Sequence, residues 1–106
     1  MLNKIRLMLE YGCYPVWLYD ENDELIDTLL PEEIRGNSEL DSMFDALQAR
    51  FESLFINNQN EFTYVGFSTV EDKLQFLNDW NKAVKELIQC LNERYTIVDE
   101  ISKVFN

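Results

Sequence analysis

Histidine is absent from this chain, and glycine, proline, cysteine and basic residues are scarce. Without an imidazole, the commonest general base, the serine and cysteine catalytic dyads and most zinc sites are excluded. The three glycines, Gly12, Gly36 and Gly66, lie too far apart for a dinucleotide fingerprint or a phosphate-binding loop. We therefore expect neither an enzyme nor a cofactor, with catalysis only a minor alternative.

A metal site is equally unsupported. Asp20, Asn22 and Glu24 have the alternate spacing of the first ligands in a calcium loop. However, Leu25 stands where that loop needs glycine for its sharp turn, and Pro31 stands where it needs a bidentate glutamate. This acidic stretch is more consistent with the tip of a hairpin, and we expect no bound metal.

Long apolar runs are also missing. No stretch is apolar over the length needed to span a bilayer, and the negative surface would be repelled by anionic lipid. The first residues carry Lys4, Arg6 and Glu10 where a signal peptide would be apolar, and no small-residue cleavage pattern follows. The sequence thus predicts a cytoplasmic protein with no membrane contact.

The composition nevertheless favours a folded chain. Hydrophobic residues make up 46% and aromatic residues 13%, enough to form a core despite a formal charge of -11. At 106 residues we expect one domain spanning residues 1–106. Cys13 and Cys90 lie among apolar neighbours and are expected to be buried free thiols rather than a disulfide.

Alternating residues predict a strand over residues 4–11, with an edge or bend at Gly12 to Pro15 before the strand continues through residues 16–19. Turn-forming residues at positions 20–23 then precede an apolar stretch, residues 25–30, that Pro31 ends. Together these segments predict a β-hairpin with an acidic tip.

Two amphipathic helices are expected after the hairpin. Ser38 with Asp41 resembles a capping box, and Ser68 with Glu71 resembles a second one. The apolar stripe of the first helix recurs at helical spacing at Leu40, Met43, Phe44, Leu47, Phe51, Leu54 and Phe55, with Glu39, Asp45, Gln48 and Glu52 turned to water. The stripe of the second, which ends near Asn92, comprises Val70, Leu74, Leu77, Val84, Leu87, Ile88 and Leu91, with Trp80 extending its buried face.

The remaining segments complete the predicted fold. Residues 57–60 read as a polar loop, and residues 62–65 read as either a short strand or an extended connector. Residues 95–98 are rich in β-formers and should rejoin the sheet. The fold class is therefore α+β: a small antiparallel sheet of three to four strands, including an N-terminal β-hairpin, with two amphipathic helices on one face.

One region is acidic without any balancing base. No Lys or Arg occurs between Leu7 and Ile34. The acids within it are Glu10, Asp20, Glu21, Asp23, Glu24, Asp27, Glu32 and Glu33. A field of one sign accelerates capture of a basic partner and rejects nucleic acid, although acidic loops can also serve solubility alone.

Four aromatic residues lie within this acidic region: Tyr11, Tyr14, Trp17 and Tyr19. They span both faces of the predicted strand and cannot all enter one core. Tyr and Trp are enriched at the energetic centres of protein interfaces, and beside carboxylates they suit a partner rich in Arg and Lys. The alternative is that a second layer or a second copy of the chain covers them.

The segment Tyr11-Gly-Cys-Tyr-Pro-Val-Trp17 is preceded by Ile5-Arg-Leu-Met8 and followed by Leu30-Pro31, a helix, Gly66-Phe67 and a last helix-strand pair. In these features the chain resembles a family of small acidic bacterial proteins with a tyrosine-glycine-cysteine-aromatic-proline-x-tryptophan signature. Some of its members are similar to immunity proteins encoded beside polymorphic or contact-dependent toxins. The resemblance implies a binding protein whose partner is a cognate toxin.

The leading hypothesis is a non-enzymatic protein that neutralises a basic effector, such as a nuclease toxin, by occluding its active site. Asp20, Glu21, Asp23, Glu24 and Asp27 are the candidate residues for steering and charge-assisted hydrogen bonds. The candidates for the desolvated anchor are Tyr14, Trp17 and Tyr19. Two alternatives remain: a self-associating structural or regulatory domain that forms a homodimer through residues 13–19, and a DNA-mimicking inhibitor.

Overall fold

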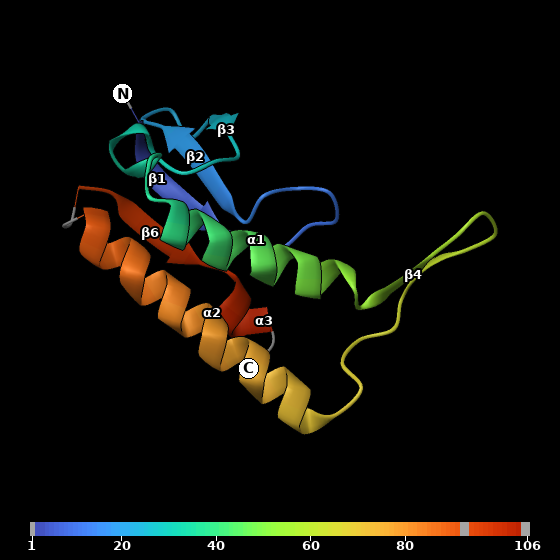
Figure 1. Cartoon of the computed structure of the whole chain (residues 1–106). Coiled ribbons are helices and arrows are strands. Elements are labelled where there is room, and N and C mark those ends of the chain that lie inside the picture. Colours follow the sequence, from blue (N-terminus) through green and yellow to red (C-terminus); the bar gives the residue numbers. More distant parts are fainter. Residues whose placement is uncertain (1, 92–93, 105–106) are drawn as a thin grey trace.

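Two layers, a sheet and a pair of helices, form the body of the computed structural model, which describes residues 2–91 and 94–104 (Figure 1). The sheet has the order β3-β2-β1-β6, made of β1 (Leu2–Leu7), β2 (Val16–Asp20), β3 (Leu25–Asp27) and β6 (Thr96–Asp99). The helices are α1 (Ser38–Glu52) and α2 (Val70–Leu91), with a short helical turn η1 (Glu32–Ile34) and a final short helix α3 (Ile101–Val104). The predicted α+β class with two amphipathic helices is confirmed.

The sheet is mixed rather than antiparallel throughout, which corrects the predicted pairing. β1 pairs antiparallel with β2 but parallel with β6, where Ile5 lies beside Ile97. The predicted return of residues 95–98 to the sheet is confirmed. Its direction follows from α2, because this long helix carries the chain back to the end of the sheet where β1 starts (Figure 1).

The predicted strand over residues 4–11 is too long. β1 ends at Leu7, and residues 8–15 form a loop that reverses the chain into β2. The loop is closed by a 3.0 Å hydrogen bond from the Met8 N–H to the Pro15 carbonyl, and Gly12 adopts a positive φ of 82°. The bend expected at Gly12 to Pro15 is therefore a complete reversal of the chain. As a result, β2 runs back beside β1 and pairs with it, instead of continuing β1 in the same direction.

This loop docks on α1 through a side chain that we predicted to face water. Gln48 is buried, and its Nε2 donates hydrogen bonds to the Glu10 carbonyl at 2.8 Å and to Glu52 Oε2 at 3.0 Å. The Gly12 N–H also donates to Glu52 Oε2, at 2.8 Å. The prediction for Gln48 was wrong because helical periodicity does not show that a distant loop covers this face of the helix.

The hairpin with an acidic tip is present between β2 and β3. Its turn is closed by 3.0 Å hydrogen bonds from the Asp20 N–H to the Glu24 carbonyl and from the Asp23 N–H to the Asp20 carbonyl. β3 ends at Asp27, earlier than the predicted limit at Leu30, whose side chain is instead buried in the core.

Both helices start with side-chain caps, each shifted by one residue from the prediction. At α1 the N-cap is Asn37, whose Oδ1 accepts a 3.0 Å hydrogen bond from the Leu40 N–H. At α2, Thr69 Oγ1 accepts a 3.0 Å hydrogen bond from the Asp72 N–H. As predicted, a side chain accepts a hydrogen bond from an otherwise unpaired N–H in the first turn of each helix. In both helices that side chain belongs to the residue next to the predicted one.

The core lies between one face of the sheet and the two helices. The sheet contributes Ile5, Leu7, Val16 and Leu18, all fully buried. The helices contribute Leu40, Phe44, Leu47 and Phe51 from α1, and Phe76, Trp80, Ala83, Leu87 and Leu91 from α2. The predicted burial of Trp80 is confirmed. Three positions assigned to the buried stripe of α2 are instead exposed: Val70, Leu74 and Ile88.

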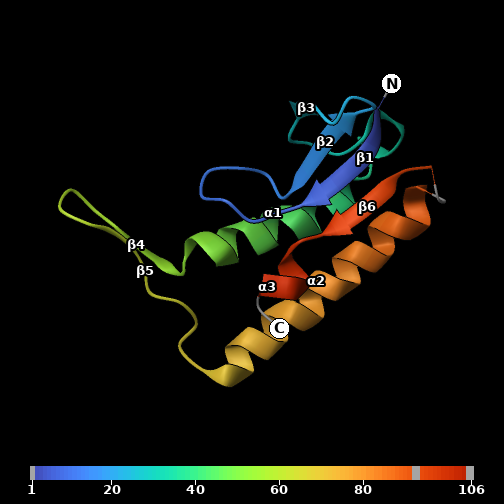
Figure 2. The ribbon, with the colours of Figure 1, turned by 180° about the vertical axis from the view of Figure 1, so that it is seen from behind.

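A second, two-stranded sheet projects from the end of α1, away from the body (Figure 2). It consists of β4 (Phe55–Asn57) and β5 (Phe62–Tyr64), paired antiparallel around the polar loop. Residues 62–64 thus form a strand, one of the two predicted alternatives. Phe55, expected in the stripe of the first helix, lies in this hairpin because α1 ends at Glu52.

The two cysteines, Cys13 and Cys90, are free and half-buried. None of the helices in the described segments combines the length and apolarity that a bilayer crossing requires.

Candidate functional site

The sheet presents one face to the helices and leaves the other uncovered by them. Because side chains alternate along a strand, burial of Ile5, Leu7, Val16 and Leu18 places their neighbours on the opposite side. The register pairs Lys4 with Tyr19 and Arg6 with Trp17. We call the surface formed by Lys4, Arg6, Trp17 and Tyr19 the open face.

Two cations flank an aromatic ring on the open face. Lys4 Nζ lies 5.7 Å and the Arg6 guanidinium carbon 5.5 Å from the centroid of the Tyr19 ring, within the range of cation–π attraction. Arg6 Nε is buried, and within the described chain it has no hydrogen-bond partner. Sequence reasoning missed this arrangement, because the register of β1 against β2 was needed to bring the two bases beside Tyr19.

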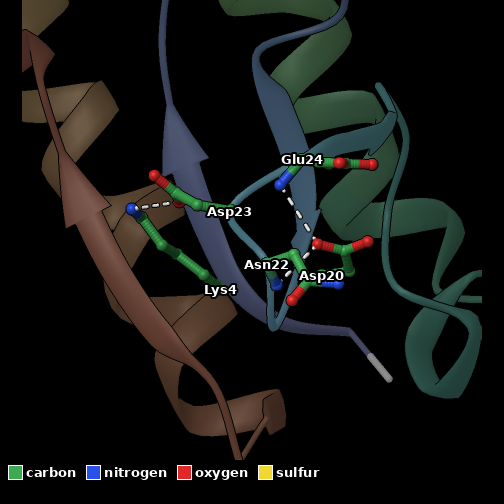
Figure 3. A network of polar contacts seen from close by, with 5 residues as sticks. All are labelled: Lys4, Asp20, Asn22, Asp23 and Glu24. Carbon is green, nitrogen blue, oxygen red and sulfur yellow. Dashed lines mark hydrogen bonds and ion pairs between the residues drawn. The ribbon is translucent and has the colours of Figure 1, made fainter.

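The five predicted acidic residues lie along the β2–β3 hairpin, at the edge of the sheet next to the open face. We call Asp20, Glu21, Asp23, Glu24 and Asp27 the acidic turn. Asp20 is occupied in holding the turn, since its Oδ1 accepts hydrogen bonds from the N–H groups of Asn22 at 2.8 Å and Glu24 at 3.1 Å (Figure 3). Asp23 has a positive φ of 63° at the same turn.

Asp23 connects the acidic turn to the open face. Its Oδ1 lies 2.6 Å from Lys4 Nζ, and the hydrogen bond and positive charge of Lys4 hold the pKa of the Asp23 carboxyl below its usual range. The pair is exposed to solvent, so its contribution to stability is small. Its structural effect is to place a cation and an anion side by side where sequence reasoning predicted only negative charge.

Glu24 differs from Asp20 and Asp23 because its carboxylate points away from the Lys4–Asp23 pair (Figure 3). It is exposed, and no cation in the described residues pairs with it. Asp27 is also exposed, and its Oδ1 accepts a 2.8 Å hydrogen bond from the adjacent Thr28 N–H. Both carboxylates are therefore accessible to solvent.

Tyr14 is separated from the other two predicted anchors. Its ring packs edge-on to Phe44 at 6.3 Å, and its hydroxyl donates a 2.8 Å hydrogen bond to Asp41 Oδ1 on α1. Burial, the hydrogen bond and the negative charge of Asp41 together raise the pKa of the Tyr14 hydroxyl well above its usual range. Trp17 and Tyr19 share the open face, whereas Tyr14 tethers the β1–β2 loop to α1.

The Tyr14–Asp41 contact predicts a pH-dependent stability. A tyrosine whose folded-state pKa is raised stabilises the fold fully below its unfolded pKa of about 10, and this stabilisation is lost as the pH rises further. We therefore expect Tyr14→Phe to lower the free energy of unfolding by about 1 kcal/mol near neutral pH and by less above pH ~10. Urea unfolding at both pH values measures this difference.

The matched comparison is Tyr14→Phe in an Asp41→Asn background. There the hydroxyl no longer meets a charged acceptor, so the loss near neutral pH should be smaller and vary less with pH. An equal loss from Tyr14→Phe at neutral and alkaline pH would contradict this account.

The open face and the acidic turn are neighbouring surfaces, because β2 carries Trp17 and Tyr19 and leads directly into the turn. Trp17 supplies a half-buried aromatic surface whose Nε1 is already bonded to the Tyr14 carbonyl at 3.0 Å, which holds the ring in place. The described side chains contain no cluster of three or more His, Cys, Asp and Glu residues arranged to hold a metal ion.

Comparison with known protein families gives a match that covers most of this chain. The family model described as Serratia CdiI immunity protein-like matches residues 3–99, from β1 to β6, and so includes the acidic turn and the open face. No curated protein sequence matches the chain. The predicted resemblance to immunity proteins of contact-dependent toxin systems is confirmed. The chain therefore belongs to the Serratia CdiI immunity protein-like family.

Proposed function

We propose that this chain is an immunity protein that binds a basic toxin, of the nuclease class, and neutralises it by covering the toxin's cationic substrate groove. Membership of the immunity protein-like family supports the binding of a cognate toxin. The observation that carries the finer assignment is the acidic turn beside Trp17 and Tyr19, in a chain with a formal charge of -11.

The negative charge of the acidic turn indicates the class of toxin that the chain would bind. A nuclease must present Lys and Arg to the phosphates of its substrate, so its active groove is positive. A surface bearing several carboxylates attracts such a groove and accelerates encounter, and the same charge keeps the immunity protein itself away from nucleic acid. A nuclease is therefore the toxin class that best complements the acidic turn.

The residues of the site have different roles in this proposal. Glu24 and Asp27 provide exposed carboxylates for steering and for charge-assisted hydrogen bonds to the toxin. Asp20 and Asp23 hold the shape of the turn through their contacts with Glu24 and Lys4. Glu21 adds negative charge at the same turn.

The aromatic part of the site supplies the anchor. Trp17 and Tyr19 are half-buried on the open face, so a partner that covers them removes the remaining aromatic surface from water. Tyr19 is held by its two flanking cations and Trp17 by its hydrogen bond to Tyr14, so little side-chain entropy is lost on binding. Inhibition in this mechanism is occlusion, and no bond is made or broken.

The direct test starts with the genes beside that of this chain, among which the proposal predicts one for a toxin with nuclease activity. Its nuclease activity should disappear when one equivalent of the chain is added and return when high salt separates the proteins. Binding without loss of nuclease activity would contradict occlusion. A toxin with a different activity that is still neutralised would contradict only the nuclease assignment.

Charge reversal at Glu24 tests the steering role. Glu24→Lys should slow association with the toxin roughly tenfold at low salt and make the rate less sensitive to salt, because it weakens the attractive field at the turn. Stopped-flow measurement over a salt series reports both quantities. Glu24 is a sharper probe than Asp23, whose reversal would also disrupt the contact with Lys4.

The matched control is Glu71→Lys in the first turn of α2, which changes the net charge by the same amount. The start of α2 lies far from the hairpin of β2 and β3 that carries the acidic turn (Figures 1 and 2). The substitution costs helix stability of about 0.3–1 kcal/mol through the helix dipole but should leave the association rate near that of the wild type. Equal slowing by the two variants would mean that only net charge matters.

A further inference from the structure

The β4–β5 hairpin exposes apolar side chains that the proposed toxin site does not use. Phe62 is 56%, Val65 55%, Tyr64 48% and Ile56 40% exposed. The hairpin projects from the far end of α1 and lies at the opposite end of the molecule from the acidic turn (Figures 1 and 2). Exposed apolar patches of this kind mark sites of protein contact.

The aromatic side chains of the hairpin form one ordered cluster. The register pairs Phe55 with Tyr64 and Asn57 with Phe62, so these four side chains share one face. Phe55 stacks on Phe62 at 5.1 Å and contacts Tyr64 edge-on at 5.2 Å. Tyr11, from the β1–β2 loop, packs edge-on to Phe62 at 4.9 Å. The cluster is thus preorganised while still exposed to solvent.

Charge distinguishes this hairpin from the rest of the chain. Residues 54–69 contain one charged side chain, Glu61, although the chain as a whole has a formal charge of -11. Two copies of such an acidic protein repel each other at most approaches. At the hairpin they can meet with little juxtaposition of like charges, whereas a basic toxin would find almost no complementary charge there.

The backbone of β5 is also suited to pairing. Hydrogen bonds join Asn58 with Glu61 and run from the Val65 N–H to the Leu54 carbonyl. Because hydrogen-bonded pairs alternate along an antiparallel ladder, the N–H and C=O groups of Phe62 and Tyr64 point away from β4. These groups form an edge that another strand can pair with.

We propose that β5 is a homodimerisation edge, at which two copies pair antiparallel about Thr63 and join their hairpins into one four-stranded sheet. In this arrangement Phe62 of each copy lies opposite Tyr64 of the other. The two aromatic clusters then form one continuous aromatic surface across the interface, and cross-strand aromatic pairs stabilise sheets. Pairing also supports the hairpin itself, since an isolated two-stranded hairpin is marginally stable in water.

The oligomeric state of the full chain tests the proposal. Sedimentation equilibrium should show a reversible dimer that becomes stronger as salt screens the repulsion between the two acidic chains. The double variant Phe62→Ser with Tyr64→Ser should weaken the dimer roughly tenfold or more, and circular dichroism should show that the rest of the fold is retained. The opposite response to salt separates this contact from toxin binding, which salt weakens.

A cysteine cross-link tests the register. Thr63 of the two copies would face each other as a non-hydrogen-bonded pair, about 4.5 Å apart between Cα atoms, which lies within the range that a disulfide requires. In a background of Cys13→Ser and Cys90→Ser, Thr63→Cys should form a covalent dimer on mild oxidation. The control Gln59→Cys, in the loop at the tip of the hairpin, should cross-link more slowly.

Three results would overturn the proposal. The first is a monomer at all concentrations and salt levels, and the second is cross-linking of Thr63→Cys no faster than of Gln59→Cys. The third is a loss of toxin binding in the Phe62 and Tyr64 double variant, which would assign the hairpin to the toxin interface. Failure of dimerisation leaves the proposed neutralisation intact, because that is measured by nuclease activity.

Discussion

Trp80→Ala should lower the free energy of unfolding by about 4 kcal/mol, a large part of the 5–15 kcal/mol or so typical of a whole domain. Trp80 is fully buried on α2. Its ring packs edge-on to Phe44 of α1 at 5.9 Å and stacks on Phe76 at 6.4 Å. Removing it leaves a cavity between the two helices and the sheet, so both transfer and cavity terms contribute.

Equilibrium urea unfolding followed by circular dichroism measures this loss. The control is Val84→Ala, one helical turn further along α2, where a half-buried side chain packs at the margin of the core. We expect a loss of about 1 kcal/mol there, since fewer buried atoms are removed. A loss from Trp80→Ala no larger than that of Val84→Ala would show that Trp80 is not the centre of the core.

Asp99→Ala should lower the free energy of unfolding by about 3 kcal/mol, because one carboxylate satisfies several donors. Asp99 Oδ1 accepts hydrogen bonds from Trp80 Nε1 at 3.1 Å, the Ile101 N–H at 3.0 Å and the Ser102 N–H at 3.1 Å. Oδ2 accepts a further hydrogen bond from Ser102 Oγ at 2.7 Å. Alanine removes the acceptor of the Ile101 and Ser102 N–H groups at the start of α3. It also leaves the buried indole N–H of Trp80 without its acceptor.

The conservative variant Asp99→Asn separates the hydrogen bonds made to Oδ1 from the other contributions of the Asp99 carboxylate. Its amide oxygen can still accept the bonds made to Oδ1, so we expect a loss of about 1 kcal/mol. A double-mutant cycle with Trp80→Phe isolates the indole contact, because phenylalanine retains a ring but has no N–H. Additive losses from Asp99→Ala and Trp80→Phe would show that the two side chains are not coupled.

Trp80 and Asp99 illustrate what a sequence pattern can and cannot predict. Helical spacing placed Trp80 on the buried side of α2, and the β-forming residues after that helix indicated a strand, β6. Neither pattern could show that Asp99, at the end of β6, meets the Trp80 indole. That contact depends on β6 running parallel to β1 in the sheet.

In the candidate site, too, the sequence predicted some features and only the structure revealed the others. The predicted acidic residues do lie together on one hairpin, because a turn keeps neighbouring residues close. Of the three predicted anchors, Trp17 and Tyr19 share the open face, whereas Tyr14 is bonded to Asp41 on α1. The residues added by the structure, Lys4 and Arg6, come from the adjacent strand and reach Tyr19 only through the register of β1 and β2.

By itself the sequence determined the α+β class, the two amphipathic helices and the acidic hairpin, because charge and hydrophobic periodicity are local properties of the chain. The motif from Tyr11 to Trp17 carried the resemblance to immunity proteins. Tertiary structure alone decided where β1 ends, the parallel pairing of β6 and the projection of the β4–β5 hairpin. It also decided which aromatic residues face solvent. The physical reason is that strand register and the docking of loops depend on which distant surfaces become buried together, and local periodicity does not specify these partners.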